Sequence, residues 1–581
     1  MLICCVYARV LFFYLTKILT MILSTSTKRL AISAAVFFFT GIGSLTAAPP
    51  NNDFKIVKNL DLFFSVFREL KLFYVDDIDP DKVVKNGIEG MLSELDPYTE
   101  YMTEEEAKDF DVATTGEYGG IGSLIQKSGD YTKASEVYKG FPADKAGLVA
   151  GDLMVEIDGV SLKGKPIEDV SNMLKGPKGT SFRLKVVKVK TKDTIELKLT
   201  REKIHISGIT YYNALSNGVG YIRLSSFTQG CSKDFRNAFL DLKNTKGISS
   251  LVVDLRGNGG GSMEEAIKIV NMFVPKGTEV VRAKGRVAEF DYVYKADEEP
   301  IDTNIPLAIL VNSGSASSSE IVAGAIQDLD RGIVVGTRTF GKGLIQAVRP
   351  LSYNAKIKIT TAKYYTPSGR CVQAHNFSKR NADGSVSFIP DSLKTMYHTK
   401  AGREVYDGGG ILPDVQDSIE AYSNISVSLL LRGLIADYSI KYHCEHESAA
   451  PPETFMLSDN DYADFVAFLE GKEYDYQTRS ESLLKQLKAA VEKEKYEEEV
   501  EKEIAILEKK LAHDKKKDLE VFKPEIKRLI EEEIAVRYYY QEGRIRSLIK
   551  DDSQLRKATE YLLAPAKYHK LLSVDVKTAT E

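Results

Sequence analysis

Short apolar runs alternate with amphipathic stretches through the middle of the chain, which is the pattern of strands alternating with helices. The runs at residues 307–312 (LAILVN) and 332–337 (GIVVGT) are brief and rich in branched side chains, so they predict buried strands. Between them, residues 317–329 carry apolar side chains at helical spacing. This order predicts a βαβ unit, whose two strands are parallel and whose crossover is right-handed.

A second element of this kind precedes the first. Residues 249–255 (SSLVVDL) predict a buried strand, residues 256–262 (RGNGGGS) a glycine-rich loop and residues 263–273 a helix. Further strands are predicted at residues 356–367 and 409–415. Residues 205–424 are therefore expected to form a mixed α/β core.

The regions on either side of this core have different patterns. Residues 51–115 predict helices, one of them started by a capping box of Thr103 and Glu106. Residues 116–204 read as glycine loop, strand, turn, helix and strands. Residues 425–581 are helical and densely charged, which is typical of a solvated face or a coiled-coil arm. With 581 residues the chain is long enough for several domains.

The N-terminus predicts a targeting segment. Residues 30–45 (LAISAAVFFFTGIGSL) are apolar, follow Lys28 and Arg29, and precede small residues. A basic, apolar and then small-residue order is that of a secretory signal, and the apolar part is short for a spanning helix. Residues 1–47 are thus expected to be a signal peptide, with an uncleaved membrane anchor as the alternative.

Composition narrows the classes of function. The chain has 78 basic and 82 acidic residues and a net charge of −4, so nucleic acid is not an expected partner. Outside the N-terminal segment the cysteines are Cys231, Cys371 and Cys444, too far apart for a zinc motif or a disulfide framework. We expect no metal and no cofactor.

The candidate chemistry lies where the two strands of the βαβ unit end. Ser317 follows the first strand, and Lys342, between Gly341 and Gly343, follows the second. Parallel strands bring both side chains to one edge of the sheet. A serine hydroxyl becomes a nucleophile when a base takes its proton, and burial favours the neutral lysine that can do so. The non-catalytic alternatives are that Ser317 is only the N-cap of the helix, with Glu320 three residues on, and that Lys342 is an ordinary solvent-facing loop lysine.

Acyl transfer also requires donors for an oxyanion. The loop at residues 256–262 is expected at the same sheet edge, so the backbone N–H groups of Gly260, Gly261 and Ser318 are candidates. Asp254 and Arg256 are assigned a structural role in holding this loop. Gln346 either orients the lysine amine or caps a strand. The alternative for the loop is a tight or phosphate-cradling glycine turn.

A nucleotide-binding loop is the main rival motif. Residues 336–343 (GTRTFGKG) fit G-x-x-x-x-G-K, but Gly343 stands where magnesium binding requires serine or threonine. The residues that follow read as a strand, whereas a phosphate-binding loop leads into a helix. The pattern therefore disfavours this interpretation.

Two parts of the sequence resemble known protein families. AGLVAGDLMVEIDG (residues 146–159) resembles a PDZ domain, which implies that Gly120, Ile121 and Gly122 form the loop that binds a peptide carboxylate. DLRGNGGG, SGSASSSEIVAGAIQD, GTRTFGKGLIQ, YYTPSGR and GGGILPDV together resemble the bacterial carboxy-terminal processing, or tail-specific, proteases over residues 55–420.

The second resemblance implies a crotonase/ClpP-like protease core at residues 205–424 with a PDZ domain inserted at 116–204. It implies a Ser317–Lys342 dyad oriented by Gln346, substrates with free C-termini, and protein processing in the periplasm of the cell envelope. Cys371 replaces a more usual serine and Tyr98–Thr99 a His–Ser pair, and we expect neither change to touch the dyad.

Some alternatives stay open. A catalytically silent PDZ scaffold of the same fold is the alternative to an enzyme. Membrane association through the N-terminus, and dimerisation or adaptor binding through residues 425–581, are hypotheses that the sequence raises.

Overall fold

The computed structural model describes residues 52–380, 386–418, 421–511 and 515–573. The chain divides into two compact units, residues 1–91 and 92–581. The first holds α3 (Asn52–Phe73) and most of α4 (Pro80–Ser93), so the lead-in is helical as predicted. The expected signal at residues 1–47 lies outside the described residues. Within those residues, no helix has the length and apolar character needed to cross a bilayer.

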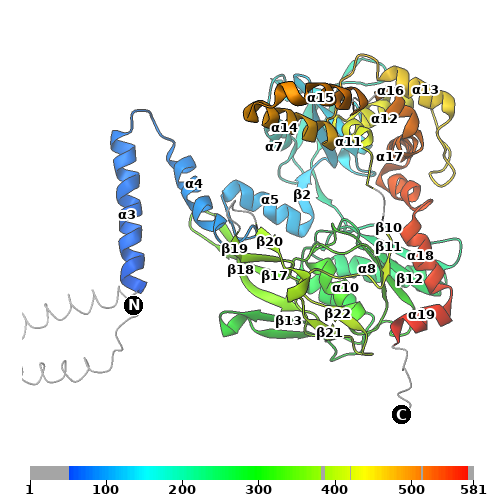
Figure 1. The fold of residues 1–581 in the computed structure, drawn as a ribbon. Coiled ribbons are helices and arrows are strands. Elements are labelled where there is room, and N and C mark those ends of the chain that lie inside the picture. Colours follow the sequence, from blue (N-terminus) through cyan, green and yellow to red (C-terminus); the bar gives the residue numbers. More distant parts are fainter. Residues whose placement is uncertain (1–51, 381–385, 419–420, 512–514, 574–581) are drawn as a thin grey trace, which may run out of the picture. The chain divides into compact units, whose positions relative to one another are not determined.

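A six-stranded sheet forms the centre of the second unit (Figure 1). Five of its strands, β11, β12, β15, β16 and β23, run parallel to one another, and β10 at the edge pairs antiparallel with β11. The predicted βαβ unit is confirmed, because α10 (Ser318–Asp328) joins two adjacent parallel strands. In spatial order the strands are β10 (Ile209–Ala214), β11 (Val219–Leu224), β12 (Ser250–Asp254), β15 (Leu307–Val311), β16 (Ile333–Gly336) and β23 (Val415–Gln416).

Helices cover both faces of this sheet. Since side chains alternate along a strand, Leu251 and Val253 belong to one apolar cluster and Val252 to another. The first cluster includes residues of α8 (Cys231–Asn244), α9 (Met263–Asn271) and α10. The second includes residues of the end of α17 (Lys523–Ile549), of α18 (Ser553–Leu562) and of α19 (Pro565–Leu572), and Figure 1 shows α18 beside the sheet.

The chain's last described helices are therefore a layer of the core. The Tyr568 hydroxyl of α19 accepts a hydrogen bond from the Leu307 N–H at 3.0 Å and donates one to the Leu307 carbonyl at 3.1 Å. Leu555, Ala558 and Leu562 of α18 are buried in the same layer. The sequence did not reveal this arrangement, because the helical region after residue 425 is mainly charged.

The α/β part also has a second large sheet, the PDZ domain, and two short hairpins formed by β19 (His375–Arg380) with β20 (Val386–Phe388) and by β21 (Met396–His398) with β22 (Glu404–Tyr406). The second sheet has β1 (Glu100–Met102), β13 (Glu279–Gly285), β14 (Tyr292–Lys295), β17 (Leu344–Pro350) and β18 (Lys356–Tyr365). The PDZ sheet has β3 (Ser123–Ser128), β4 (Tyr131–Val137), β5 (Leu153–Ile157), β7 (Ser181–Val187) and β8 (Thr194–Thr200), with the short β6 (Val160–Ser161) paired to β5 and with helices α6 (Pro142–Lys145) and α7 (Ile167–Leu174). A ribbon of β2 (Glu117–Gly120) and β9 (Glu202–His205) flanks it in sequence.

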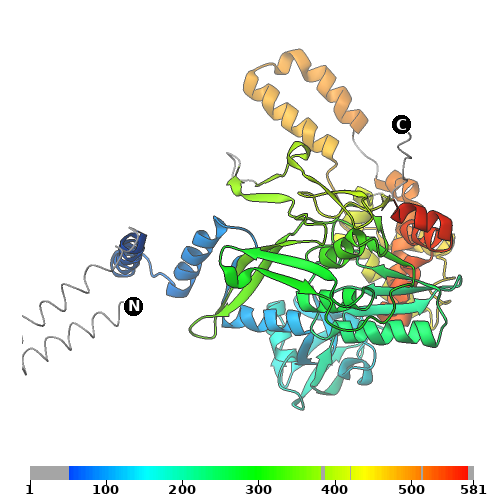
Figure 2. The ribbon, with the colours of Figure 1, turned by 90° about the horizontal axis from the view of Figure 1, so that it is seen from below.

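The helices that follow have their own apolar core. They are α11 (Asn424–Leu431), α12 (Leu434–Glu445), α13 (Asp459–Phe468), α14 (Arg479–Glu494), α15 (Glu497–Leu511) and α16 (Lys515–Val521), with the first part of α17. Figure 2 shows α14 and α15, in orange, as an antiparallel hairpin. Helix α17 has a kink at Tyr540 (φ 56°, ψ −157°), after which it reaches the protease sheet.

Candidate active site

Ser317 occupies a strained turn between β15 and α10. Its backbone lies at φ 55° and ψ −113°, a conformation that costs a non-glycine residue about 1–3 kcal/mol. An ordinary N-cap residue has extended backbone angles, as Ser262 does at the start of α9. The strain at Ser317 thus favours a functional role over simple capping. A serine on a sharp strand-to-helix turn is the arrangement that exposes a nucleophile at a sheet edge.

Glu320 links the serine to the lysine. Its buried carboxylate accepts the Ser317 N–H at 2.9 Å through Oε2, and the same oxygen accepts the Lys342 N–H at 2.9 Å. Oε1 accepts the Gly341 N–H at 2.7 Å and the Thr339 hydroxyl at 2.6 Å. Burial raises the pKa of Glu320, while the donated hydrogen bonds act in the opposite direction. One carboxylate therefore holds the backbone at Ser317 and the backbone at Lys342 together. From the sequence, only its capping-box contact with Ser317 was predicted.

The glycine loop lies directly against the serine. A side chain at Gly260, where φ is +103°, would meet the Ser317 Cβ at 2.8 Å. The Ala316 N–H and the Ser319 hydroxyl donate to the Asn258 carbonyl at 3.0 and 2.8 Å. The close approach of Ser317 to the loop explains why residue 260 is a glycine.

The three candidate oxyanion donors differ in availability. The Gly260 N–H already donates to the Asn258 Oδ1 at 2.9 Å. The N–H groups of Gly261 and Ser318 have no acceptor among the residues that the structure describes. In this conformation, the N–H groups of Gly261 and Ser318 are therefore the two candidates that are not already engaged by a described residue.

The Lys342 amine rests on an aromatic ring. Its Nζ lies 4.5 Å from the centre of the Tyr98 ring, and among described residues it forms no hydrogen bond or ion pair. Burial is the main cause that lowers the pKa of Lys342, the nearby Lys358 ammonium adds to it, and Glu100, Glu320 and Asp96 oppose it. The expectation that Tyr98 stays away from the dyad is therefore wrong. Strand β1 pairs with β18, and this pairing places Tyr98, which lies just before β1 in the chain, next to Lys342.

Gln346 lies in β17 and donates to the Thr360 hydroxyl at 3.1 Å. Thr360 in turn donates to Asp96 at 3.1 Å, and Thr99 donates to the other oxygen of Asp96 at 3.0 Å. In this conformation the amide therefore joins a polar network beside the lysine rather than the amine itself. No local pattern could reveal this network, because its link between Asp96 and Thr360 joins residues 264 positions apart in the chain.

We expect the pH dependence of cleavage to report the surroundings of Lys342. Because its pKa is lowered, the activity of the wild type should rise with pH and reach its plateau below the ordinary lysine range. Replacing Lys358 by methionine removes a repelling cation and frees Glu100, its partner at 2.9 Å, so both effects raise the pKa of Lys342.

The rising limb of kcat/KM against pH should accordingly move to higher pH in Lys358→Met. Lys356→Met is the matched control, since Lys356 is on the same strand but pairs with Asp111. A limb that stayed in place, or moved equally in both variants, would contradict the assignment of Lys342 as the titrating base.

The predicted carboxylate loop stands beside an open strand edge. Gly120 ends β2, Ile121 is buried, and Gly122 has φ +74° with Phe141 so close that a side chain would meet it at 2.4 Å. The carbonyls of Ile121 and Gly122 accept hydrogen bonds from Ala143 and Tyr138 at 2.9 Å. Strand β3 lies at the end of its sheet and contacts α7, so it offers the edge to which an extended peptide adds.

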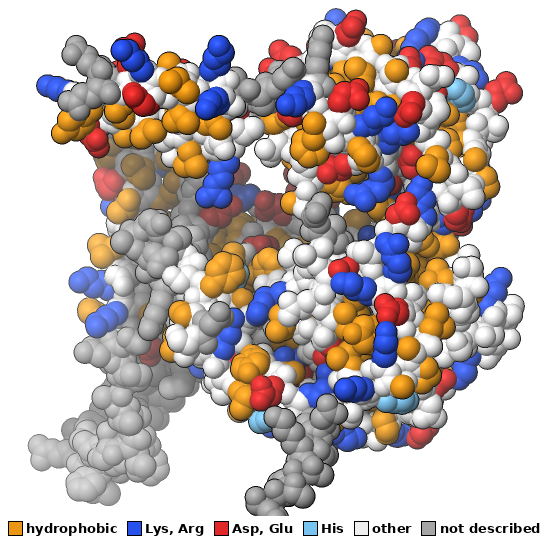
Figure 3. Space-filling view, turned by 45° about the vertical axis from the view of Figure 1, so that its right-hand side comes forward, with side chains coloured by type: hydrophobic (Ala, Val, Ile, Leu, Met, Phe, Trp, Pro, Cys, Tyr) orange, Lys and Arg blue, Asp and Glu red, His pale blue; other side chains and the backbone are white. Residues whose placement is uncertain are grey.

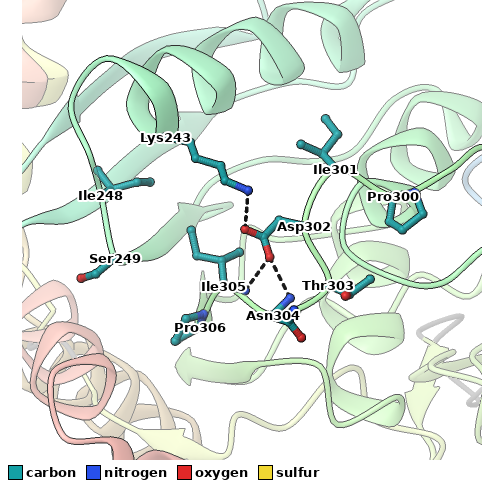
Figure 4. Close-up of a pocket in the computed structure, with 10 residues that line it drawn as sticks. All are labelled: Lys243, Ile248, Ser249, Pro300, Ile301, Asp302, Thr303, Asn304, Ile305 and Pro306. Atoms are coloured by element: carbon teal, nitrogen blue, oxygen red, sulfur yellow. Dashed lines mark hydrogen bonds and ion pairs between the residues drawn. The ribbon is translucent and has the colours of Figure 1, made fainter.

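One surface hollow is lined by neither Ser317 nor Lys342. Figure 4 shows this hollow of about 560 Å³, in which Lys243 and the N–H groups of Asn304 and Ile305 all turn toward the Asp302 carboxylate. These charged and N–H groups thus satisfy each other. No group of side chains in the described ranges has the make-up of a metal site. Over the described residues drawn in Figure 3, basic and acidic side chains are interspersed.

Comparisons with known proteins bear on the class of enzyme. The model of peptidase family S41 matches residues 218–379, a PDZ-domain model matches 133–188, and a model described as a probable PDZ-protease C-terminal helical domain matches 425–562. A carboxy-terminal-processing protease of Bartonella bacilliformis is 35% identical over 352 residues, covering 59% of this chain and 80% of that protein.

Two further proteins are similar. A probable CtpA-like serine protease of Staphylococcus aureus is 36% identical over 317 residues, covering 54% of this chain and 62% of that protein. The solved photosystem II D1 C-terminal processing protease is 28% identical, covering 61% of this chain and 92% of that one, with a TM-score of 0.34.

Fold and matches together define a serine-type peptidase with a mixed α/β core, a PDZ domain and a helical C-terminal region. The chain belongs to the carboxy-terminal-processing proteases of peptidase family S41. The family recognised from the sequence motifs is thereby confirmed.

Proposed function

We propose that this peptidase cleaves peptide bonds with a Ser317–Lys342 dyad and takes substrates by their C-terminal tails. The observation that carries the dyad is the shared Glu320 oxygen, which binds the backbone N–H of both residues at one sheet edge. The strained backbone of Ser317 and the lowered pKa of Lys342 support the same assignment.

The reaction follows from these groups. The neutral Lys342 amine takes the Ser317 hydroxyl proton while Oγ bonds to the scissile carbonyl carbon. The oxygen that becomes negative is stabilised by the N–H groups of Gly261 and Ser318. Collapse of this intermediate breaks the C–N bond, and the Lys342 ammonium returns the proton to the leaving amine. A water molecule then adds to the acyl carbon, with Lys342 again as the base; the bond from that carbon to the Ser317 Oγ breaks, and the Lys342 ammonium returns the proton to the serine.

The PDZ domain supplies the recruiting step in this proposal. A substrate tail adds to the edge of β3, and its terminal carboxylate binds backbone N–H groups of the Gly120–Gly122 loop. The order of charges and apolar residues before residue 47 supports action outside the cytoplasm, in the periplasm. Membrane association, dimerisation and adaptor binding stay hypotheses.

Tail recognition is tested with an unfolded reporter that ends in an apolar tail, made with a free or an amidated C-terminus. Loss of hydrogen bonds to a charged group costs about 1.5–3 kcal/mol, so amidation should lower kcat/KM by about tenfold or more. The change should reside in KM, because the PDZ loop takes no part in bond breaking. Equal KM values for both reporters would refute tail recruitment but would leave the assignment of the Ser317–Lys342 dyad unaffected.

A further inference from the structure

The loop of the candidate oxyanion donors is held from the C-terminal helices. Arg256, the second residue after β12, has a mostly buried side chain that donates to both oxygens of Asp254 at 2.9 and 2.6 Å. The same guanidinium donates to the Asp552 Oδ2 at 2.5 Å and to the Gln554 Oε1 at 3.0 Å. Asp552 and Gln554 lie at the start of α18, almost 300 residues further along the chain.

These partners are themselves fixed. The other oxygen of Asp552 accepts the Leu555 N–H at 2.9 Å, which makes this residue the N-cap of α18. The Gln554 amide is fully buried and donates to the Asp417 carbonyl at 2.6 Å. Because α18 also packs on the sheet, it provides a rigid support rather than a loose tail.

The held loop continues directly to the nucleophile. Two residues after Arg256, the Asn258 side chain bonds the Leu224 carbonyl and the Gly260 N–H, at 2.8 and 2.9 Å. Further on, the Gly261 carbonyl accepts the Ser318 hydroxyl at 2.9 Å. The position of Arg256 thus bears on where Gly261 and Ser318 present their N–H groups, and oxyanion donors are effective only within a few tenths of an ångström of their target.

We propose that Asp552 and Gln554 are positioning residues of the peptidase, which act through Arg256 to hold the oxyanion loop against Ser317. The inference rests on the proposed function. It gives the last part of the C-terminal region a role in the chemistry, beyond covering the sheet.

The test uses the full chain with Asp552→Asn. Asparagine caps a helix as well as aspartate does, so α18 keeps its start, but the bond to Arg256 loses its charge. We expect kcat to fall about tenfold, part of the roughly 10²–10³-fold that loss of an oxyanion donor costs, with KM unchanged. Gln554→Met, which keeps the volume of the side chain, should act in the same direction.

A second measurement separates positioning from general destabilisation. A peptide aldehyde adds to the serine hydroxyl to give a hemiacetal whose oxygen occupies the oxyanion site, so its affinity should fall with kcat. Lys557→Met is the matched control, because it breaks the pair of α18 with Asp417 without touching Arg256. This variant should keep both kcat and aldehyde affinity.

A double-mutant cycle with Arg256→Lys tests whether Asp552 acts through Arg256. If Asp552 acts through Arg256, the double variant should lose no more kcat than Arg256→Lys alone. Additive losses, or unchanged kcat and aldehyde affinity in Asp552→Asn, would overturn the inference while the wild type still cleaved its substrate. A wild type that cleaved no tail peptide would overturn the proposed function, and this inference with it.

Discussion

Replacement of Ser317 by alanine is expected to lower kcat by a factor on the order of 10⁶, to the level left by binding and oxyanion donors alone. The hydroxyl has no substitute beside it, because the hydroxyls of Ser315, Ser318 and Ser319 are engaged elsewhere. Ser315 and Ser319 donate to the Leu255 and Asn258 carbonyls, both at 2.8 Å. Substrate binding should persist in the Ser317→Ala protein, and single-turnover assays on the reporter measure the loss.

Lys342→Met should give a loss of similar size, since nucleophile and base act as a unit and their effects do not add. Ser313→Ala is the matched control, because Ser313 is exposed in the same segment and should be replaceable without effect. Cleavage that survived in either dyad variant, with identical products, would mean that another pair performs the chemistry. Melting curves of all three variants check that each one folds.

The second large effect is expected at Glu320. Replacing this side chain by alanine leaves the N–H groups of Ser317, Gly341 and Lys342 and the Thr339 hydroxyl without their acceptor in a buried place. Each orphaned donor costs about 1–3 kcal/mol, so the free energy of unfolding should fall by several times that amount unless water enters. The lysine loop would then shift, and a displacement of about 1 Å can cost about 10²-fold in kcat.

Glu320→Gln is the informative companion variant. Glutamine keeps one carbonyl oxygen and the shape of the side chain, so stability should recover more than activity does. A purely structural role predicts that kcat and stability recover together, and that the pH profile stays that of the wild type. The measurements are thermal unfolding and kcat against pH for both variants.

Local sequence patterns predicted most elements of the core, but the strand expected at residues 409–415 is wrong for all but its last residue, because only β23 (Val415–Gln416) pairs there and Pro413 has no N–H to donate to a neighbouring strand. Strands β12, β15 and β16 are short apolar runs and are buried on both faces, while α10 carries its apolar residues at helical spacing. The chain order of strand, helix and strand then brought Ser317 and Lys342 to one edge, because parallel strands end on the same side. Nothing beyond residues 307–342 was needed for this step.

Other features were out of reach because they join distant segments. Tyr98 meets Lys342 across a strand pair that no local pattern specifies, and Arg256 meets Asp552 across almost 300 residues. The charged helices after residue 425 gave no sign that α18 and α19 cover the sheet, since only a few apolar positions on each helix do so. Glu320 looked like a capping residue because its three other partners come from a later loop.

The sequence alone determined the class of peptidase, the parallel strands and the residue types available for catalysis, since these follow from periodicity and from contiguous motifs. The tertiary structure decided which of those groups are held by hydrogen bonds, which amine is partly buried, and which candidate N–H groups have no acceptor among the described residues. Such properties depend on burial and on distances of a few ångströms, and these are set by segments that meet only when the whole chain folds.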